Sequence, residues 1–137
     1  MPREVSTTSE YTLRDQERMQ LAPNYYQWQA RFDSQYLGSR VLEIGCGVGN
    51  FTRYLLERPV TMAIDKDESC ISRLLERFGP HQNLTARTMD LLDPAFLDWK
   101  KHHPDSIVML NVLEHIQDDA RALQQVHAVL PLSLIHI

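Results

Sequence analysis

Three glycines at alternate positions constrain this chain more than any other feature. Gly45, Gly47 and Gly49 follow a short apolar run that begins at Val41, and they are three of the five glycines in the sequence. Glycine adopts positive φ angles without strain and lets a ligand approach bare backbone. An apolar strand, a glycine turn and a helix opening near Phe51 therefore predict a loop that holds a nucleoside cofactor at a helix N-terminus.

Short apolar runs alternate with helical patterns from residue 40 onward. Ile71, Leu74 and Phe78, for example, recur at helical spacing between two apolar runs. This regular alternation predicts an α/β fold with a doubly wound parallel sheet that is covered on both faces, and 137 residues leave room for one such domain. Strands are expected at 41–44, 60–64, 84–88 and 106–110.

The N-terminal segment does not share this pattern. Residues 1–22 are polar and show no periodicity, which predicts a mobile arm. After Pro23, aromatic residues recur at helical spacing, so we expect an aromatic helix face that packs mainly against the flank of the sheet. Tyr25 or Tyr26 is the candidate for the entrance of the cofactor site. The aromatic residues are Tyr25, Trp28, Phe32 and Tyr36.

The C-terminal residues are interpreted as a non-native tail. Residues 132–137, LSLIHI, are too few to supply the turn and strand that should follow Leu130, and codons for them resemble a transposon end used to fragment DNA. A short natural strand is the alternative. The expected organisation is an arm at 1–22, a partial domain at 23–131 and a tail at 132–137, with strand 106–110 left as an unpaired apolar edge.

Composition and charge narrow the class of protein. Fourteen Lys and Arg stand against eighteen Asp and Glu, and no window concentrates the basic residues, so a nucleic-acid partner is not expected. Cys46 and Cys70 lack metal-site spacing and have no basic neighbour that would favour a nucleophile. Since the N-terminus has no apolar signal core, we expect a cytoplasmic protein without a membrane segment.

Acidic residues stand where two of the expected strands end. Asp65 follows Gly45 by 20 residues, the offset of an acid that binds ribose hydroxyls, and Asp90 ends the third strand. Strand-end carboxylates converge at the carboxyl edge of a parallel sheet. The dinucleotide pattern would also need a glycine at position 50, but that residue is Asn50, so the NAD pattern is imperfect.

Together these segments resemble the class I S-adenosylmethionine-dependent methyltransferases, within them the broad bacterial small-molecule type. The resemblance is carried by residues 43–49 (EIGCGVG), Asp65, Asp90 and residues 111–119 (NVLEHIQDD). It implies a Rossmann-like sheet of seven strands, of which about four are present here. It also implies S-adenosylmethionine as the cofactor and a C-terminally truncated fragment that is inactive by itself.

The resemblance further implies roles for individual residues. His115, just beyond the fourth strand, is the candidate catalytic base, and a histidine that only hydrogen-bonds backbone at a helix start is the alternative. Glu114 and His115 could bind a metal, but Asn111 stands where another acidic ligand would be needed, so no metal is expected. The methionine part of the cofactor would be held by Glu43, Gly45, Gly47 and Gly49 above Asn111, the ribose by Asp65, and the adenine edge by Asp90 and the Leu91 backbone.

The expected function is transfer of a methyl group from S-adenosylmethionine to a small-molecule or glycan-related acceptor. An NAD-dependent oxidoreductase is one alternative, against which Asn50 and the NVLEH segment argue. A non-catalytic cofactor-binding module is the other. The acceptor, the methylated atom and the oligomeric state are left open by the sequence.

Overall fold

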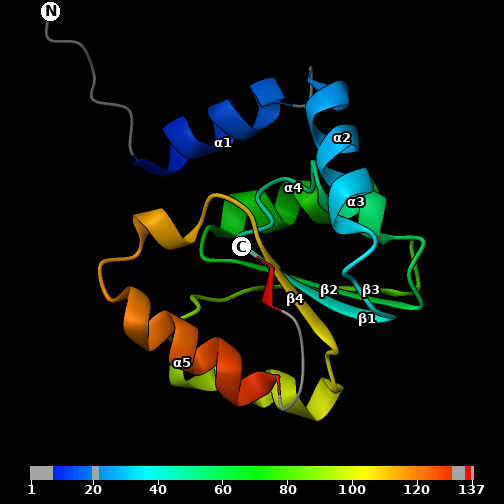
Figure 1. Ribbon diagram of the computed structural model, residues 1–137. Coiled ribbons are helices and arrows are strands. Elements are labelled where there is room, and N and C mark those ends of the chain that lie inside the picture. Colours follow the sequence, from blue (N-terminus) through cyan, green and yellow to red (C-terminus); the bar gives the residue numbers. More distant parts are fainter. Residues whose placement is uncertain (1–7, 20–21, 131–134, 137) are drawn as a thin grey trace, which may run out of the picture.

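The computed structural model describes residues 8–19, 22–130 and 135–136. Its centre is a parallel sheet with the strand order β3-β2-β1-β4-β5 (Figure 1). Strands β2 and β3 lie on one side of β1, and β4 and β5 lie on its other side. This is the doubly wound order of nucleotide-binding folds, so the predicted fold class is confirmed. The strands are β1 (Arg40–Ile44), β2 (Val60–Asp65), β3 (Leu84–Thr88), β4 (Ser106–Met109) and β5 (Ile135–His136).

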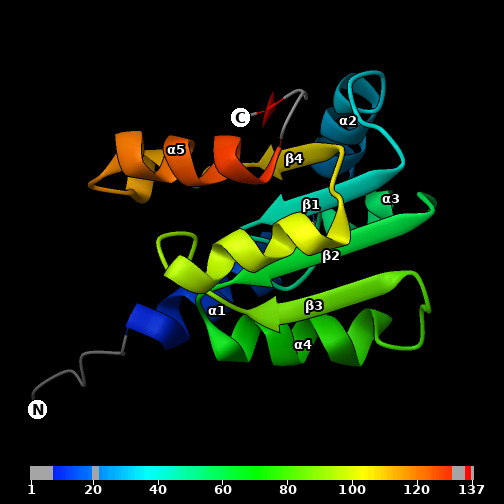
Figure 2. The same cartoon turned by 90° about the horizontal axis from the view of Figure 1, so that it is seen from below.

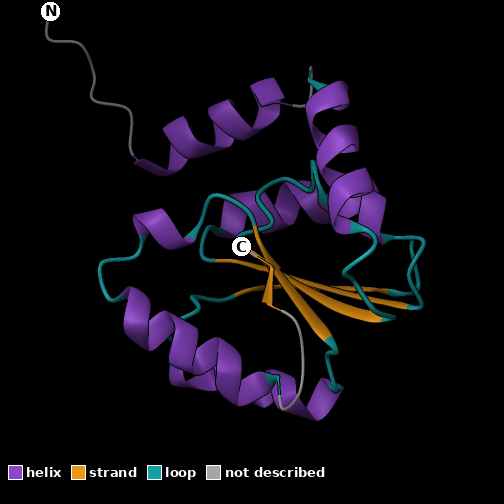
Figure 3. Ribbon diagram, viewed as in Figure 1, coloured by secondary structure: helices purple, strands orange, loops and turns teal. Residues whose placement is uncertain are grey.

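Helices cover both faces of the sheet (Figure 3). On one side lie α2 (Pro23–Asp33), α3 (Thr52–Leu55) and α4 (Glu68–Phe78), with α1 (Thr8–Met19) outside α4. On the other side lie the 3-10 helix η1 (Pro94–His102) and α5 (Asp119–Val129), which stand in front of the sheet in Figure 2. A short 3-10 helix, η2 (Leu113–His115), connects β4 to α5.

Acidic side chains cap the N-termini of α4 and α5, which pack on opposite faces of the sheet. Asp67 accepts a hydrogen bond from the backbone N–H of Ser69 at 2.9 Å before α4, and Asp118 accepts one from Arg121 at 3.1 Å before α5. Such caps satisfy N–H groups that have no partner inside the helix.

The core has two faces because successive strand residues point to opposite sides of the sheet. Leu42, Met62 and Ile107 pack with Phe96 and Trp99 of η1 and with α5. On the opposite face, Val41 and Val108 pack with Phe51 and Leu55. Burial on both faces explains why the strands read as nearly continuous apolar runs.

The N-terminal segment differs from the expected arm. Residues 8–19 form α1, which is attached to α4 by an ion pair of 3.0 Å between Glu17 Oε1 and Arg73 Nε. The Gln16 carbonyl also accepts a hydrogen bond of 2.8 Å from Asn50 Nδ2. These contacts are polar, so an apolar periodicity could not reveal them. The remaining part of the predicted arm, residues 1–7 and 20–21, lies outside the described residues.

The aromatic residues of α2 also differ from the expectation. Trp28 is 64% exposed and Phe32 is 52% exposed, and their rings stack on each other at a centroid distance of 6.3 Å. Tyr26 and Ala30 pack against the core instead. The prediction that the aromatic stripe packs against the sheet is therefore wrong, because shared spacing identifies one helix face but does not say which face turns inward.

A short strand lies beside β4, where an unpaired edge was expected. In β5, Ile135 is opposite Ile107 and His136 is opposite Val108 in parallel register. The four expected strands are confirmed, and a fifth strand of two residues pairs with β4, while the interpretation of residues 132–137 as a non-native tail stays a prediction. Residues 131–134 and 137 lie outside the described residues.

Candidate functional site

A cavity of about 1300 Å³ lies at the carboxyl ends of the strands. Residues at the ends of four strands and residues of α1 and α2 line it. The structure therefore brings most of the predicted site residues into one place. Those that line the cavity are Glu43, Gly45, Asp65, Asp90, Leu91, Asn111 and His115.

The glycine turn beside the cavity needs its glycines for two reasons. Gly45, Gly47 and Gly49 have φ angles of 73°, 54° and 93°, in the region that side chains rarely adopt. A Cβ on Gly49 would also stand 2.8 Å from the Phe78 ring, and one on Gly47 would meet the Gln16 side chain. Gly47 and Gly49 are buried and shape the turn without themselves lining the cavity.

Glu43 is the most unusual titratable group of the site. It is the next-to-last residue of β1, it is 3% exposed, and its side chain accepts a hydrogen bond from the Thr52 hydroxyl at 2.5 Å. Burial raises the pKa of Glu43 to about 8, the Asp65 charge adds to this, and the Thr52 hydrogen bond acts in the opposite direction. A positively charged group placed beside this carboxyl would favour its ionised form and offset the cost of its burial.

Asp65 holds the glycine turn in addition to its predicted role. Its Oδ2 accepts from the Gly47 N–H at 2.9 Å, and its Oδ1 accepts from the Asp67 N–H at 2.9 Å. Burial raises the pKa of Asp65, while the two backbone hydrogen bonds lower it. Because a carboxylate has about four acceptor positions, Asp65 can still accept from two ligand hydroxyls.

Asp90, which follows the third strand, accepts a hydrogen bond from a backbone N–H group two residues further on. Asp90 is exposed, and its Oδ1 accepts from the Leu92 N–H at 2.8 Å. Leu91 is buried, and its carbonyl accepts from Gln125 Nε2 of α5 at 3.4 Å. One acceptor face of Asp90 is thus used by the turn, and the rest of the carboxylate faces the cavity.

The segment after β4 contributes the opposite wall. Asn111 has φ 56°, a left-handed conformation that asparagine tolerates better than most residues, and its backbone brings Val112 against Gly45. His115 lies in η2 with its side chain 75% exposed, and its Nε2 is 4.0 Å from Glu114 Oε1. In the part of the chain that the structure describes, no group of three or more His, Cys, Asp or Glu side chains could hold a metal ion.

Both cysteines are free and buried near the turn. Burial raises the pKa of Cys70 to about 12 and the pKa of Cys46 well above its ordinary value. Burial therefore disfavours the thiolate form of both cysteines, and the expectation that neither is a nucleophile stays a prediction.

Gln16 and Asn50 are two of the cavity-lining residues that were not predicted as site residues. Gln16 comes from α1, a helix that was not expected, so nothing in the sequence pattern pointed to it. Asn50 occupies the position at which the dinucleotide pattern has glycine, and this substitution was the only signal. Tyr26, which was named as a candidate for the entrance, does line the cavity, and burial raises its pKa.

Comparison with known proteins identifies the family. The methyltransferase domain family matches residues 11–133, which is most of the chain. The chain belongs to this family. Its doubly wound sheet and the glycine turn at the strand ends agree with a class I methyltransferase, as predicted from residues 43–49.

Three similar proteins illustrate this methyltransferase domain. A ribosomal RNA small subunit methyltransferase A of Lactococcus lactis is 43% identical over 53 residues, 38% of this chain and 18% of that protein. A highly reducing polyketide synthase of Strobilurus tenacellus is 32% identical over 100 residues, 66% of this chain and 4% of that protein. A structure assigned as an S-adenosyl-L-methionine-dependent methyltransferase of Methanococcus maripaludis has a TM-score of 0.74 at 15% identity, covering 95% of this chain and 62% of that one.

The methyltransferase domain spans less than a fifth of either curated relative. The likeness to the archaeal structure, at its low identity, concerns the fold alone. Across the described residues, no helix combines the length and the apolar character that crossing a bilayer requires.

Proposed function

We propose that this domain binds S-adenosylmethionine in the strand-end cavity and transfers its methyl group to a small-molecule acceptor. The observation that carries the proposal is the meeting of Glu43, Asp65 and Asp90 around one cavity beside the glycine turn. Membership of the methyltransferase family and the name of the archaeal neighbour support the choice of cofactor.

The donor and acceptor groups of the cavity fit this cofactor. Glu43 is a buried carboxyl that suits the ammonium group of the methionine part, and the bare backbone at Gly45 leaves space above it. Asp65 keeps two acceptor positions for the ribose hydroxyls, and Asp90 with the Leu91 backbone suits the adenine edge. In this assignment Gly47 and Gly49 fix the shape of the turn, and Asn111 forms the floor.

S-adenosylmethionine supplies a methyl group on a sulfonium, which is already a good leaving group. The chain therefore has to align the acceptor and exclude water rather than form a covalent bond. For a hydroxyl acceptor, His115 is proposed as the base that takes the proton, because its ring lies on the cavity wall and is open to an incoming molecule.

The charge of the cavity favours a neutral or cationic acceptor, such as a small molecule or a sugar derivative. The acidic residues that line the cavity include Asp65, Asp67, Glu68 and Asp90, whereas Lys66 is the only lysine or arginine among its described lining residues. A phosphate backbone would be repelled at such a surface, since nucleic-acid binding depends on basic residues. The similarity to the ribosomal RNA methyltransferase covers 53 residues and does not change this charge argument.

Calorimetric titration with S-adenosylhomocysteine tests the proposal. We expect the parent chain to bind it, and Asp65→Asn to weaken binding by about 1.5 to 3 kcal/mol because hydrogen bonds to a charged acceptor are lost. Asp98→Asn, an exposed change on η1 outside the cavity lining, is the control and should bind like the parent. Stabilisation by NAD and not by S-adenosylhomocysteine in a thermal-shift assay would refute the proposal.

A further inference from the structure

The N-terminal helix α1 places one side chain in the cofactor cavity. Gln16 is part of the cavity wall, and its Oε1 lies 2.5 Å from the position that a Cβ on Gly47 would take. Among the hydrogen bonds of the described residues, none involves the Gln16 side chain. Its amide, with two donor hydrogens and one acceptor, is therefore available to a molecule that rests on the glycine turn.

The backbone of α1 is joined to that same turn through Asn50. The Asn50 side chain is buried, and its Nδ2 donates to the Gln16 carbonyl at 2.8 Å. Its Oδ1 accepts from Arg77 Nη1 at 3.2 Å, and the same nitrogen donates to the Val48 carbonyl at 2.7 Å. If α1 moved away, the buried Nδ2 group of Asn50 would lose the Gln16 carbonyl as its acceptor, which is unfavourable. Asn50 thus links the position of α1 to the conformation of the turn.

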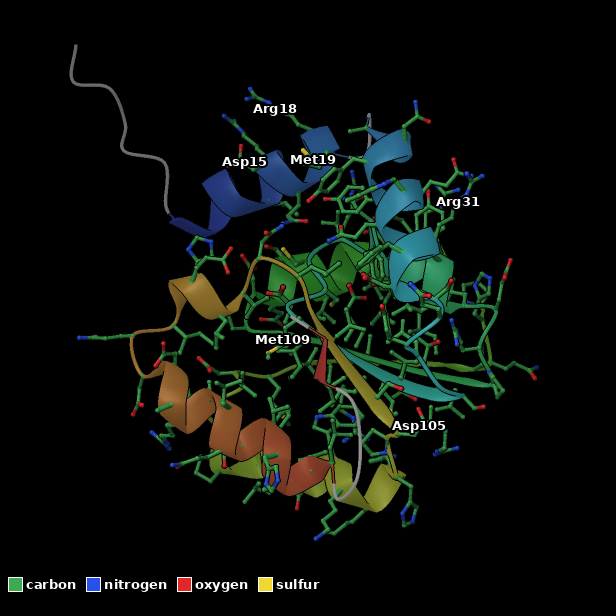
Figure 4. All side chains as sticks on the ribbon, in the orientation of Figure 1. Asp15, Arg18, Met19, Arg31, Asp105 and Met109 are labelled. Carbon is green, nitrogen blue, oxygen red and sulfur yellow. The ribbon has the colours of Figure 1, made fainter. Side chains whose placement is uncertain are left out.

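The two sides of α1 have different surroundings. On the inner side, Gln16 meets the cavity and Glu17 forms the ion pair with Arg73. On the outer side, Asp15, Arg18 and Met19 point away from the sheet in Figure 4. The helix therefore lies over the cavity as a separate element, and a change at Arg18 can be made without touching the cavity.

From these contacts we infer that α1 is a cap of the cofactor cavity and that Gln16 is a binding residue for the methionine end of the cofactor. This inference rests on the proposed function. The methionine part carries a carboxylate beside its ammonium group, and the Gln16 amide can donate to the carboxylate while Glu43 receives the ammonium. Asn50 borders the cavity as well, and it acts as a positioning residue because its side chain holds the Gln16 backbone and Arg77 beside the turn.

Binding of the cofactor and seating of α1 are then thermodynamically linked. A ligand that contacts Gln16 holds α1 in place, and a correctly seated α1 raises the affinity for the ligand by the same factor. The 137-residue chain with S-adenosylhomocysteine as the probe can show both sides of this linkage.

The test compares Gln16→Ala with Arg18→Ala by calorimetry and by amide hydrogen exchange. Gln16→Ala should weaken binding by about tenfold to a hundredfold, the loss of one hydrogen bond to a charged carboxylate, while alanine preserves the helix. Arg18→Ala should bind like the parent. In the parent, saturating S-adenosylhomocysteine should slow exchange both in the glycine turn and in α1, and in Gln16→Ala the slowing in α1 should be smaller.

The outcomes separate this inference from the proposed function. If the ligand binds and protects the glycine turn but leaves exchange in α1 unchanged, the cap is refuted and the cofactor site stands. Equal affinity of Gln16→Ala and the parent would likewise overturn the role of Gln16. If the parent chain does not bind the ligand at all, the proposed function fails and the inference fails with it.

Discussion

The glycine turn and the N-terminal helices border the same cavity, but they are held by different forces. The turn is fixed by steric necessity, since Gly49 has no room for a side chain and the Gly47 N–H is bound to Asp65. Helix α1 is attached by polar contacts, whereas α2 packs Tyr26 and Ala30 against the core and leaves its aromatic stripe in solvent. One side of the cavity, the glycine turn, is rigid and can be recognised from its sequence motif. The other side is formed by the N-terminal helices, whose attachment no motif reveals.

The largest effect is expected in the rigid half, for Gly49→Ala. The new Cβ would stand 2.8 Å from the Phe78 ring on a backbone with φ 93°, so overpacking and strain add. We expect the free energy of unfolding to fall by about 4 kcal/mol in urea denaturation. Glu57→Ala, an exposed loop change, is the control and should stay within about 0.5 kcal/mol of the parent. Unchanged stability of Gly49→Ala would mean that the turn is not rigid.

A second effect in the rigid half depends on pH. The pKa of Glu43 is raised from 4.5 to about 8, so the folded chain keeps a proton that the unfolded chain releases. The contribution of this group to stability should therefore be largest below pH 4.5 and fall by about 4 kcal/mol as the pH rises from 5 to 9, because each pKa unit corresponds to about 1.4 kcal/mol. Urea midpoints measured from pH 5 to 9 should show this slope in the parent.

Glu43→Gln supplies the matched comparison, since the amide keeps the shape of the side chain and cannot titrate. Its stability should lose this part of the pH dependence, while Asp98→Asn on the surface should retain it. The same titration has a consequence for ligand binding, because a cationic group binds better to the ionised carboxylate. A parent slope identical to that of Glu43→Gln would show that Glu43 is ionised in the folded chain at neutral pH.

The smallest effect is expected in the N-terminal half, for Trp28→Ala. Trp28 is exposed and its ring stacks on that of Phe32, so its loss should cost about 0.5 kcal/mol. Tyr26→Ala on the inner side of the same helix should cost about 3 kcal/mol, because Tyr26 packs against the core. Urea denaturation distinguishes the two. Equal losses would indicate that the aromatic stripe is covered in solution.

The sequence predicted those features that follow directly from the properties of a residue type, such as glycine in a turn or apolar residues in a buried strand. The spacing of Gly45, Gly47 and Gly49 predicted the turn, and the alternation of apolar runs predicted the four main strands and their parallel order. Asp65 and Asp90 were placed at the cavity because strand ends of a parallel sheet share one edge. These inferences need only local geometry and the topology of the fold.

The remaining features depend on contacts between distant segments. The docking of α1 rests on Asn50 and Arg73, which lie far from it in the sequence and follow no apolar period. The orientation of α2 could not be read from its aromatic spacing, since the inward face carries Gln29 and the buried Asp33 beside Tyr26. The hydrogen bond from Gly47 to Asp65 likewise joins two motifs that the sequence presents separately.

The left-handed backbone at Asn111 limits natural variation at the opposite wall of the cavity. Glycine, asparagine and aspartate enter that conformation at the lowest cost. Most other residues at position 111 would therefore destabilise the backbone, whatever their effect on the ligand. Selection for a new acceptor would consequently act on the neighbouring positions, and position 111 would remain nearly invariant while the specificity of the enzyme diverged around it.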